Sequence, residues 1–360
     1  MESVHPQDRN LDPLLHHQED QQSTLNFPSH YLYTFQAPWL VYGLAWCNRV
    51  NNPFSLALSS FIESCNNKIV LVQLDEKTEE LHQVAQVDHP YPASKVAFIP
   101  DFSGTKPQLL ATSGDALRIW EWGSHGDLKG KALLSTNPES EYCAPLTSFD
   151  WCQVNPAILC TSSVDTTCTI WDVETQQAKT QLIAHDKEVY DVAFQTGTDN
   201  IFASAGADGS VRCFDLRNLE TSTILYEIPD DSTPILRIGW NRKEPNYMAA
   251  LVMDSSKFLL LDIRVPSLPV AEMEHKTVSH PKKLKSVNAI QWAPHSASHI
   301  CSAGDDGQTL IWDVSAIPRP IEEPILSYQS DKEVNNLQWS AADPDWIAIA
   351  TGTKMQILRV

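Results

Sequence analysis

The segment 201–217 reads IFASAGADGSVRCFDLR, and its apolar run, acidic turn and second apolar run decide the fold. Two further copies are as clear, ILCTSSVDTTCTIWDVE at 158–174 and HICSAGDDGQTLIWDVS at 299–315. Weaker copies lie at 109–122 and 247–264. Two apolar runs that flank an Asp-Gly or related turn predict a β-hairpin. Each copy is therefore expected to be a strand–turn–strand unit.

The copies recur at a nearly constant distance along the chain. The position of the tryptophan in the second copy is shared by seven units, about 43 to 51 residues apart: Val72, Trp120, Trp171, Phe214, Leu261, Trp312 and Leu358. An apolar strand precedes each hairpin, and a fourth strand fits between consecutive units. Repeats of this length that carry Trp-Asp are typical of WD-repeat propellers. The sequence therefore predicts an all-β fold, a seven-bladed WD-repeat β-propeller over residues 29–360.

The seventh unit lacks a strand at its C-terminal end. The chain ends at Val360, directly after the third strand of that unit, while Tyr31–Phe35 is a spare strand at the N-terminal side. An open ring exposes apolar sheet edges, which native proteins avoid. We therefore expect Tyr31–Phe35 to complete the seventh blade and close the ring.

Composition and charge narrow the class of protein. Residues 1–28 are rich in Gln, His and Asp without apolar periodicity, so we expect a disordered acidic tail. The chain has 45 acidic and 26 basic residues, a formal net charge of −19, which disfavours direct nucleic-acid binding and favours basic partner segments. The uncharged stretch Tyr31–Cys47 contains Gln36 and Pro38 and is short for a membrane span. Two strands explain this stretch better, and no membrane association is expected.

The cysteines give no sign of a disulfide framework or a metal site. All eight occur singly, on or near predicted strands, without a CxxC pair or zinc spacing: Cys47, Cys65, Cys143, Cys152, Cys160, Cys168, Cys213 and Cys301. We interpret them as small core residues in a reducing compartment and expect no metal or other cofactor. The polar, acidic start of the chain has no signal-peptide pattern. The expected location is the nucleus and cytoplasm.

Three residues of one unit have the identities of a hydrolase triad: His185, Ser204 and Asp208. In WD repeats these positions form a structural hydrogen-bond network, and both turns lie at the same end of the blade, so His185 can reach Asp208. The usual fourth member, a tryptophan indole, is replaced by Phe214. A triad also needs an exposed nucleophile and an oxyanion site, and no other catalytic motif occurs. We predict a structural network and no enzyme; a hydrolase is the weaker alternative.

Two consecutive units share the ending apolar-Asp-x-Arg, which contains Arg217 and Arg264. Strand direction places both arginines on the face opposite the Asp turns. Arginine is enriched in interface hot spots, so both are candidate partner-docking residues. The alternative is that each pairs with a nearby carboxylate. The basic segment 276–285 lies in a loop on the other face, either as a solvated loop or as a nuclear-import signal or contact with an acidic partner.

Longer motifs resemble one WD-repeat subfamily over residues 31–360. It comprises the plant Transparent Testa Glabra and light-regulated WD proteins, the petunia anthocyanin regulator and a related animal cullin-four-associated factor. The motifs that carry the resemblance include CAPLTSFDW at 143–151, DTTCTIWD at 165–172, TQLIAHDKEV at 180–189 and NAIQWAPHS at 288–296.

The resemblance implies a scaffold that binds other proteins. Plant members of the group assemble MYB and basic helix-loop-helix transcription factors. The animal relative carries kinases to substrates and associates with a cullin-four ubiquitin ligase through its adaptor, and Arg217 and Arg264 match the motif associated with that adaptor. We therefore expect a non-catalytic scaffold for MYB-type and basic helix-loop-helix factors. The alternative is a kinase adaptor or a substrate receptor of a cullin-four ubiquitin ligase.

Overall fold

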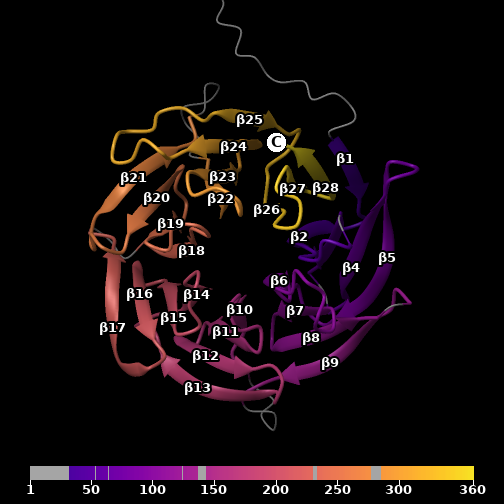
Figure 1. Ribbon diagram of the computed structural model, residues 1–360, viewed down its shortest axis with the longest axis horizontal. Helices are drawn as coiled ribbons and strands as arrows, with labels where there is room; N and C mark the ends of the chain where they lie inside the picture. The colour runs from indigo at the N-terminus through magenta and orange to yellow at the C-terminus, as the bar shows by residue number, and fades with distance from the viewer. Residues whose placement is uncertain are drawn as a thin grey trace, which may run out of the picture.

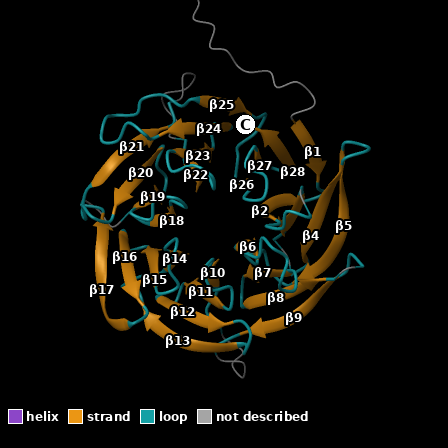
Figure 2. Ribbon diagram, in the orientation of Figure 1, coloured by secondary structure: helices purple, strands orange, loops and turns teal. Residues whose placement is uncertain are grey.

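The computed structural model describes residues 32–52, 54–63, 65–123, 125–136, 143–229, 233–276 and 285–360. These residues form seven antiparallel sheets of four strands each, arranged as blades around a central axis (Figure 1). Figure 2 shows strands and loops, with no helix in the described part of the chain. The predicted all-β, seven-bladed propeller is confirmed.

Each blade runs from an inner first strand to an outer fourth strand. Blade 1 consists of β2 (Leu40–Trp46), β3 (Ser55–Phe61), β4 (Asn67–Asp75) and β5 (Glu80–His89). Blade 2 consists of β6 (Lys95–Phe98), β7 (Leu109–Ser113), β8 (Leu117–Trp122) and β9 (Leu128–Leu134). Blade 3 consists of β10 (Leu146–Trp151), β11 (Ile158–Ser163), β12 (Thr167–Asp172) and β13 (Gln177–Ile183). Blade 4 consists of β14 (Val189–Phe194), β15 (Ile201–Gly206), β16 (Ser210–Asp215) and β17 (Asn218–Glu227).

The remaining blades follow the same order up to the point of closure. Blade 5 consists of β18 (Ile235–Trp240), β19 (Tyr247–Val252), β20 (Lys257–Asp262) and β21 (Pro269–Glu274). Blade 6 consists of β22 (Val287–Trp292), β23 (His299–Gly304), β24 (Gln308–Asp313) and β25 (Leu326–Gln329). Blade 7 consists of β26 (Asn336–Trp339), β27 (Trp346–Thr351), β28 (Lys354–Arg359) and β1 (Leu32–Gln36). All seven residues at the Trp position lie on third strands, as the repeat predicted.

The hydrophobic core is divided among the spaces between neighbouring blades. Second strands such as β11 are buried almost throughout because a blade packs against each of their two faces, whereas the outer strand β13 is largely exposed. Every first strand ends in a buried aromatic residue: Trp46, Phe98, Trp151, Phe194, Trp240, Trp292 and Trp339. The indoles of Trp46, Trp240 and Trp292 donate hydrogen bonds of 2.9–3.1 Å to carbonyl oxygens of the preceding blade. Stacked blades thus gain both apolar burial and polar contacts.

The N-terminal strand closes the ring. β1 pairs antiparallel with β28, from Leu32 opposite Leu358 to Gln36 opposite Lys354 (Figure 1). The Tyr33 ring lies 5.8 Å from the Trp346 ring, so β1 adds side-chain packing as well as backbone hydrogen bonds. The expected closure is confirmed, and within the described residues β1 extends from Leu32 to Gln36, one residue beyond the expected end at Phe35. Residue 31 and the predicted tail at 1–28 lie outside the described residues, and the tail stays a prediction.

The interpretation of all eight cysteines as core residues was wrong for two of them. Cys47, Cys152, Cys160, Cys168 and Cys301 are buried as free thiols, and Cys213 is half-buried. Cys65 and Cys143 are exposed, because they lie in connections at the ends of strands and not on the strands themselves. No helix of the described residues is long and apolar enough to cross a membrane.

Closure by β1 predicts different results for two truncations. Deleting residues 1–28 is expected to leave the melting temperature unchanged, since β1 remains. Deleting residues 1–36 removes β1 and uncovers Trp346 and the edge of β28. Losing a packed aromatic residue alone costs about 3–5 kcal/mol, so the melting temperature should fall by roughly 6 °C or more. Differential scanning calorimetry measures both, and equal values for the two truncations would contradict closure.

Candidate functional site

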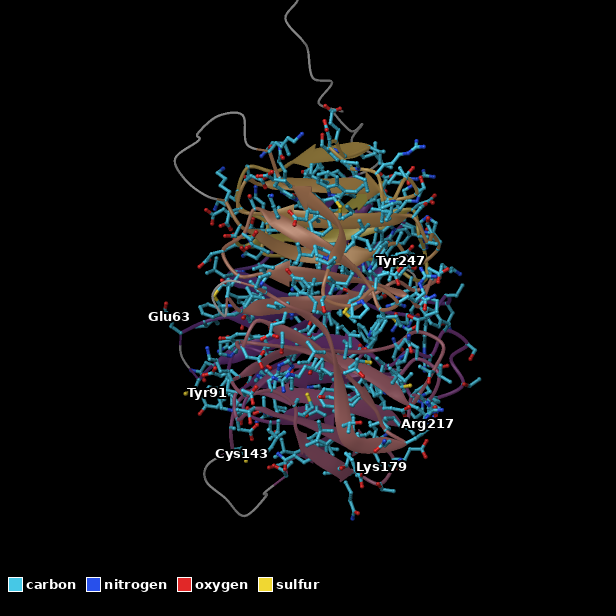
Figure 3. All side chains as sticks on the ribbon, turned by 90° about the vertical axis from the view of Figure 1, so that its left-hand side faces the viewer. Glu63, Tyr91, Cys143, Lys179, Arg217 and Tyr247 are labelled. Atoms are coloured by element: carbon cyan, nitrogen blue, oxygen red, sulfur yellow. The ribbon has the colours of Figure 1, made fainter. Side chains whose placement is uncertain are left out.

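The propeller has two distinct faces. Because the strands of a blade alternate in direction, the connections before the first strand and after the second strand lie on one face. Those after the first and third strands lie on the other. Figure 3 shows Arg217 and Tyr247 on one side of the molecule and Glu63, Tyr91 and Cys143 on the other. We call the side with Arg217 and Tyr247, where the connections after first and third strands lie, the arginine face. We call the side with Glu63, Tyr91 and Cys143 the aspartate-turn face.

The structure brings His185, Ser204 and Asp208 together in blade 4. His185 Nδ1 lies 2.9 Å from Asp208 Oδ1, and His185 Nε2 lies 2.7 Å from Ser204 Oγ. A carboxylate only accepts, so Nδ1 donates to Asp208 and Nε2 accepts from Ser204. Phe214 occupies the indole position and stacks on Phe202, with ring centroids 5.0 Å apart. The turn itself contains Gly209 at φ 77°, a backbone conformation that favours glycine.

Burial decides what this arrangement can do chemically. The Ser204 side chain is completely buried, and His185 is buried as well. A serine nucleophile must reach its substrate from solvent or from an open cleft. Ser204 therefore cannot attack a substrate in this fold, and its hydroxyl serves to orient the imidazole. The network joins the start of β14 to the hairpin between β15 and β16.

Blade 6 contains the four-residue version of the network, which the sequence analysis missed. Trp312 Nε1 donates to Ser302 Oγ at 2.9 Å, and Ser302 Oγ lies 2.7 Å from His275 Nε2. His275 Nδ1 lies 2.9 Å from Asp306 Oδ2. His185 comes four residues before its first strand, but the basic loop 276–285 separates His275 from β22. The signal that could have found it is the Ser302–Asp306 pair, which has the same spacing as Ser204 and Asp208, together with a histidine upstream of it; His275 lies 27 residues before Ser302, against 19 in blade 4.

Blade 2 has a partial network in which the aspartate has another partner. Trp120 Nε1 donates to Thr112 Oγ1 at 2.9 Å, and Thr112 Oγ1 lies 3.1 Å from His89 Nε2. Asp115 forms an ion pair with Arg118 at 2.6 Å instead of meeting the histidine. Burial lowers the pKa of His89, so this ring is neutral at physiological pH. The three hydrogen-bond networks thus share a histidine and a hydroxyl residue and differ in their other members, and their structural role stays a prediction.

Arg217 and Arg264 each pair with the aspartate of their own motif. Arg217 Nε and Nη2 donate to Asp215 at 2.8 and 2.5 Å, and Arg264 Nε and Nη2 donate to Asp262 at 2.8 and 2.7 Å. The guanidinium of Arg264 also lies 5.5 Å from the Tyr247 ring centroid. The hydrogen bonds from Arg217 lower the pKa of Asp215 to about 2, so this ion pair is intact at neutral pH.

The paired arginines nevertheless remain open to a partner. Their side chains are 68% and 54% exposed for Arg217 and Arg264. Arg264 Nη2 also donates to the Tyr247 hydroxyl at 3.3 Å. Within the described residues, Nη1 of neither guanidinium has a hydrogen bond, so each arginine keeps one nitrogen free while the aspartate holds Nε and Nη2. Pairing with a carboxylate and availability for docking are therefore compatible here. The fixed orientation reduces the side-chain entropy that binding would otherwise cost.

Exposed apolar side chains accompany the arginines on the same face. They lie in connections after first strands (Val50, Phe102 and Val154, in blades 1 to 3) and after the third strand of blade 5 (Val265 and Leu268). The aspartate-turn face has a separate apolar group in blades 1 and 2: Leu40, Tyr42, Phe61 and Tyr91. Apolar and arginine side chains together are typical of protein interfaces. Each face thus carries its own candidate binding surface.

Neither a metal site nor the basic loop contributes to the described site. Among the described residues, no group of three or more His, Cys, Asp or Glu side chains can hold a metal ion. Of the loop 276–285, residues 277–284 lie outside the described residues, so the interpretations given for this loop stay predictions.

Comparison with known proteins places the chain in a class and then in a family. The family described as WD domain, G-beta repeat, matches residues 176–215 and 273–313, which contain the histidine networks of blades 4 and 6. The chain is therefore a WD-repeat propeller protein, a class that usually acts as a binding scaffold, and the matches indicate no enzyme family.

Three relatives cover most of the chain. The DDB1- and CUL4-associated factor 7 homolog of Dictyostelium discoideum is 55% identical over 331 residues, which span 91% of this chain and 98% of that protein. An uncharacterized WD repeat-containing protein of Schizosaccharomyces pombe is 36% identical over 91% of this chain and 89% of its own length. A WD repeat-containing protein of Saccharomyces cerevisiae is 30% identical over 91% of this chain and 76% of its own length.

This protein belongs to the family of the DDB1- and CUL4-associated factor 7 homolog. The expected relationship to a cullin-four-associated factor is thereby confirmed. The narrower grouping with the plant anthocyanin regulators finds no support in these relatives.

The two histidine networks predict a graded loss of stability. Asp306→Ala leaves the buried His275 without its acceptor, at a cost of about 1–3 kcal/mol. Asp208→Ala should cost less, because the Asp208 side chain is 11% exposed against 3% for Asp306. Ser204→Ala should cost least, and the exposed control Asp186→Ala should stay within about 0.5 kcal/mol of the wild type. Urea unfolding measures the series, and an effect of Asp306→Ala no larger than that of the control would refute the structural role.

Asp208 also predicts a dependence of stability on pH. Burial opposes its ionisation, but hydrogen bonds from His185 and Ser210 outweigh burial and hold the pKa of this carboxyl below its ordinary value. A lowered native pKa stabilises the fold above the unfolded pKa of about 3.9, and the stabilisation is lost as pH falls below it. Compared from pH 6 to pH 3, the wild type should lose more stability than Asp208→Asn. The melting temperature of both proteins, measured from pH 6 to pH 3, checks this prediction. An equal fall for the wild type and Asp208→Asn would exclude a contribution from Asp208.

Proposed function

We propose that this protein is a non-catalytic scaffold that associates with a cullin-four ubiquitin ligase through its adaptor DDB1. The observation that carries the proposal is the pair of fixed, half-free guanidinium groups at Arg217 and Arg264, which lie on one face of adjacent blades. The name of the relative from Dictyostelium discoideum, which covers nearly the whole of both chains, supports DDB1 as the partner.

The arrangement of the two faces fits an adaptor role. DDB1 would engage the arginine face, where free N–H groups of Arg217 and Arg264 can donate to carboxylate or carbonyl oxygens. The neighbouring apolar side chains, among them Val265 and Leu268, would lose contact with water in the same interface. The aspartate-turn face, with its apolar group around Tyr42 and Phe61, would then remain free to bind a second protein. A kinase or a ubiquitination substrate is the kind of second partner that an adaptor of this type presents.

The assembly of MYB-type and basic helix-loop-helix factors is not part of this proposal, because none of the three relatives supports it. The expected location in the nucleus and cytoplasm stays a prediction, and it is compatible with a ligase adaptor.

The proposal is tested by a double substitution on the arginine face. Arg217→Ala with Arg264→Ala should weaken binding to purified DDB1 by about tenfold or more, the scale of one lost charge-assisted contact. The melting temperature should stay nearly unchanged, because exposed ion pairs contribute little to stability. Biolayer interferometry and calorimetry on the same samples give both values. Arg118→Ala serves as the control, since Arg118 also pairs with a neighbouring aspartate but lies on the opposite face.

Two outcomes would contradict different parts of the proposal. Full DDB1 binding by a stable double variant would exclude the arginine face as the docking surface. Absence of DDB1 binding by the wild-type protein would exclude the ligase association itself. A double variant that melts much earlier than the wild type would show that the arginines mainly support the fold.

A further inference from the structure

The central channel holds a cavity of about 240 Å³. Residues on and near the first strands line it, and β6, β10, β14 and β18 surround the centre of the ring in Figure 1. Five titratable side chains line the cavity, three cations and two carboxylates: Lys95, Arg237, Arg242, Asp150 and Asp191. In a chain whose formal net charge is −19, an excess of cations at one enclosed place is a local departure from the composition.

The carboxylate of Asp191 is fully engaged by the protein. Its Oδ1 accepts the Ser148 hydroxyl at 2.5 Å and the Val192 amide at 2.9 Å, and its Oδ2 accepts the Ile238 amide at 2.9 Å. The Lys95 ammonium lies 3.5 Å from Oδ1. Asp191 therefore ties three blades together and has little capacity left to neutralise the other cations of the cavity.

Arg237 and Arg242, in contrast to Asp191, have no partner in the protein within the described residues. Within the described residues, neither the Arg237 nor the Arg242 guanidinium has a hydrogen bond or an ion pair, although both are partly buried. Asp150 attracts Arg242 only from a longer range, while its Oδ2 accepts the Phe194 amide at 2.8 Å. Partial burial lowers the pKa of Arg242. Each guanidinium carries five N–H donors, so the cavity contains donors that face solvent and have no acceptor among the described residues of the protein.

We propose that the channel cavity is a binding site for a single oxyanion, a carboxylate or a phosphate group, recognised by Arg237 and Arg242. Guanidinium groups bind both kinds of oxyanion with two parallel hydrogen bonds, and an enclosed site strengthens such contacts. The volume lies below the roughly 300–1,000 Å³ of pockets that hold drug-sized ligands. It suits one acidic or phosphorylated side chain of a partner segment, or a free inorganic anion. Arg242 follows the first strand β18, so the cavity reaches the arginine face, but Arg217 and Arg264 do not line it.

The test uses the full-length protein and defined probes. Its melting temperature is measured in sodium phosphate and in sodium chloride of equal ionic strength. A second arm adds a capped Ala-Ala-Glu-Ala-Ala peptide, its Gln counterpart and its phosphoserine counterpart. Phosphate, the Glu peptide or the phosphoserine peptide is expected to raise the melting temperature above its control, and the Gln peptide is not. The probe that raises the melting temperature shows whether the site binds a free anion or a peptide side chain. Calorimetric titration then gives the affinity for that probe.

Substitutions separate binding from a structural role. Arg242→Met removes a partly buried cation that has no hydrogen bond within the described residues, so the free protein should melt no earlier than the wild type while the affinity for the anion falls at least tenfold. Arg237→Met should have the same two effects. It replaces Arg242→Met in the test if Arg242→Met does not fold. Arg319→Met, at an exposed position away from the channel, should keep the full anion effect. The proposal is overturned if no anion stabilises the wild type beyond its control, or if both channel variants keep the wild-type affinity.

Discussion

The pairing of β1 with β28 is the contact on which the rest of the propeller depends. Each blade buries its two faces only against neighbours, so the ring has no independent core that survives the loss of one contact. Without β1, the third strand of blade 7 would be an exposed edge and Trp346 would lose its aromatic neighbour Tyr33. Closure lets all seven spaces between blades fill at once, which holds the loops of both faces in fixed positions.

Those fixed loops set the orientation of the two arginines that we propose as docking residues. Arg217 and Arg264 lie at the ends of third strands, where the preceding aspartate holds each guanidinium in one orientation. An exposed arginine on a mobile loop would lose more side-chain entropy on binding. Each of these guanidinium groups is already paired with an aspartate carboxylate. A partner therefore interacts with a local dipole and not with a full positive charge. Binding at this face should therefore depend less on salt than binding to unpaired lysines would.

The sequence predicted the repeating parts of this structure well and the isolated parts poorly. The hairpins, the seven units and the closing strand follow from apolar periodicity and from turn residues, which are local properties repeated many times. The network of His185, Ser204 and Asp208 followed from its place in the repeat. His275 was not recognised because the loop 276–285 changes its distance from the first strand. Arg237 and Arg242 gave no signal in the sequence, because the set of residues that lines the central cavity depends on the arrangement of all seven blades. The sequence likewise does not show whether an arginine that pairs with an aspartate keeps a free guanidinium nitrogen, because this depends on side-chain geometry.

Closure of the ring also has a consequence for how the protein is made. The hydrogen bond between Gln36 and Thr353 joins residues 317 positions apart, so this contact must wait until β28 has been synthesised. Until β28 leaves the ribosome, β1 has no strand to pair with, and the blades already formed end in open apolar faces. Long-range strand pairing is slow and leaves such surfaces available for aggregation. The stage before β1 meets β28 is thus the one at which aggregation is expected to compete most with folding.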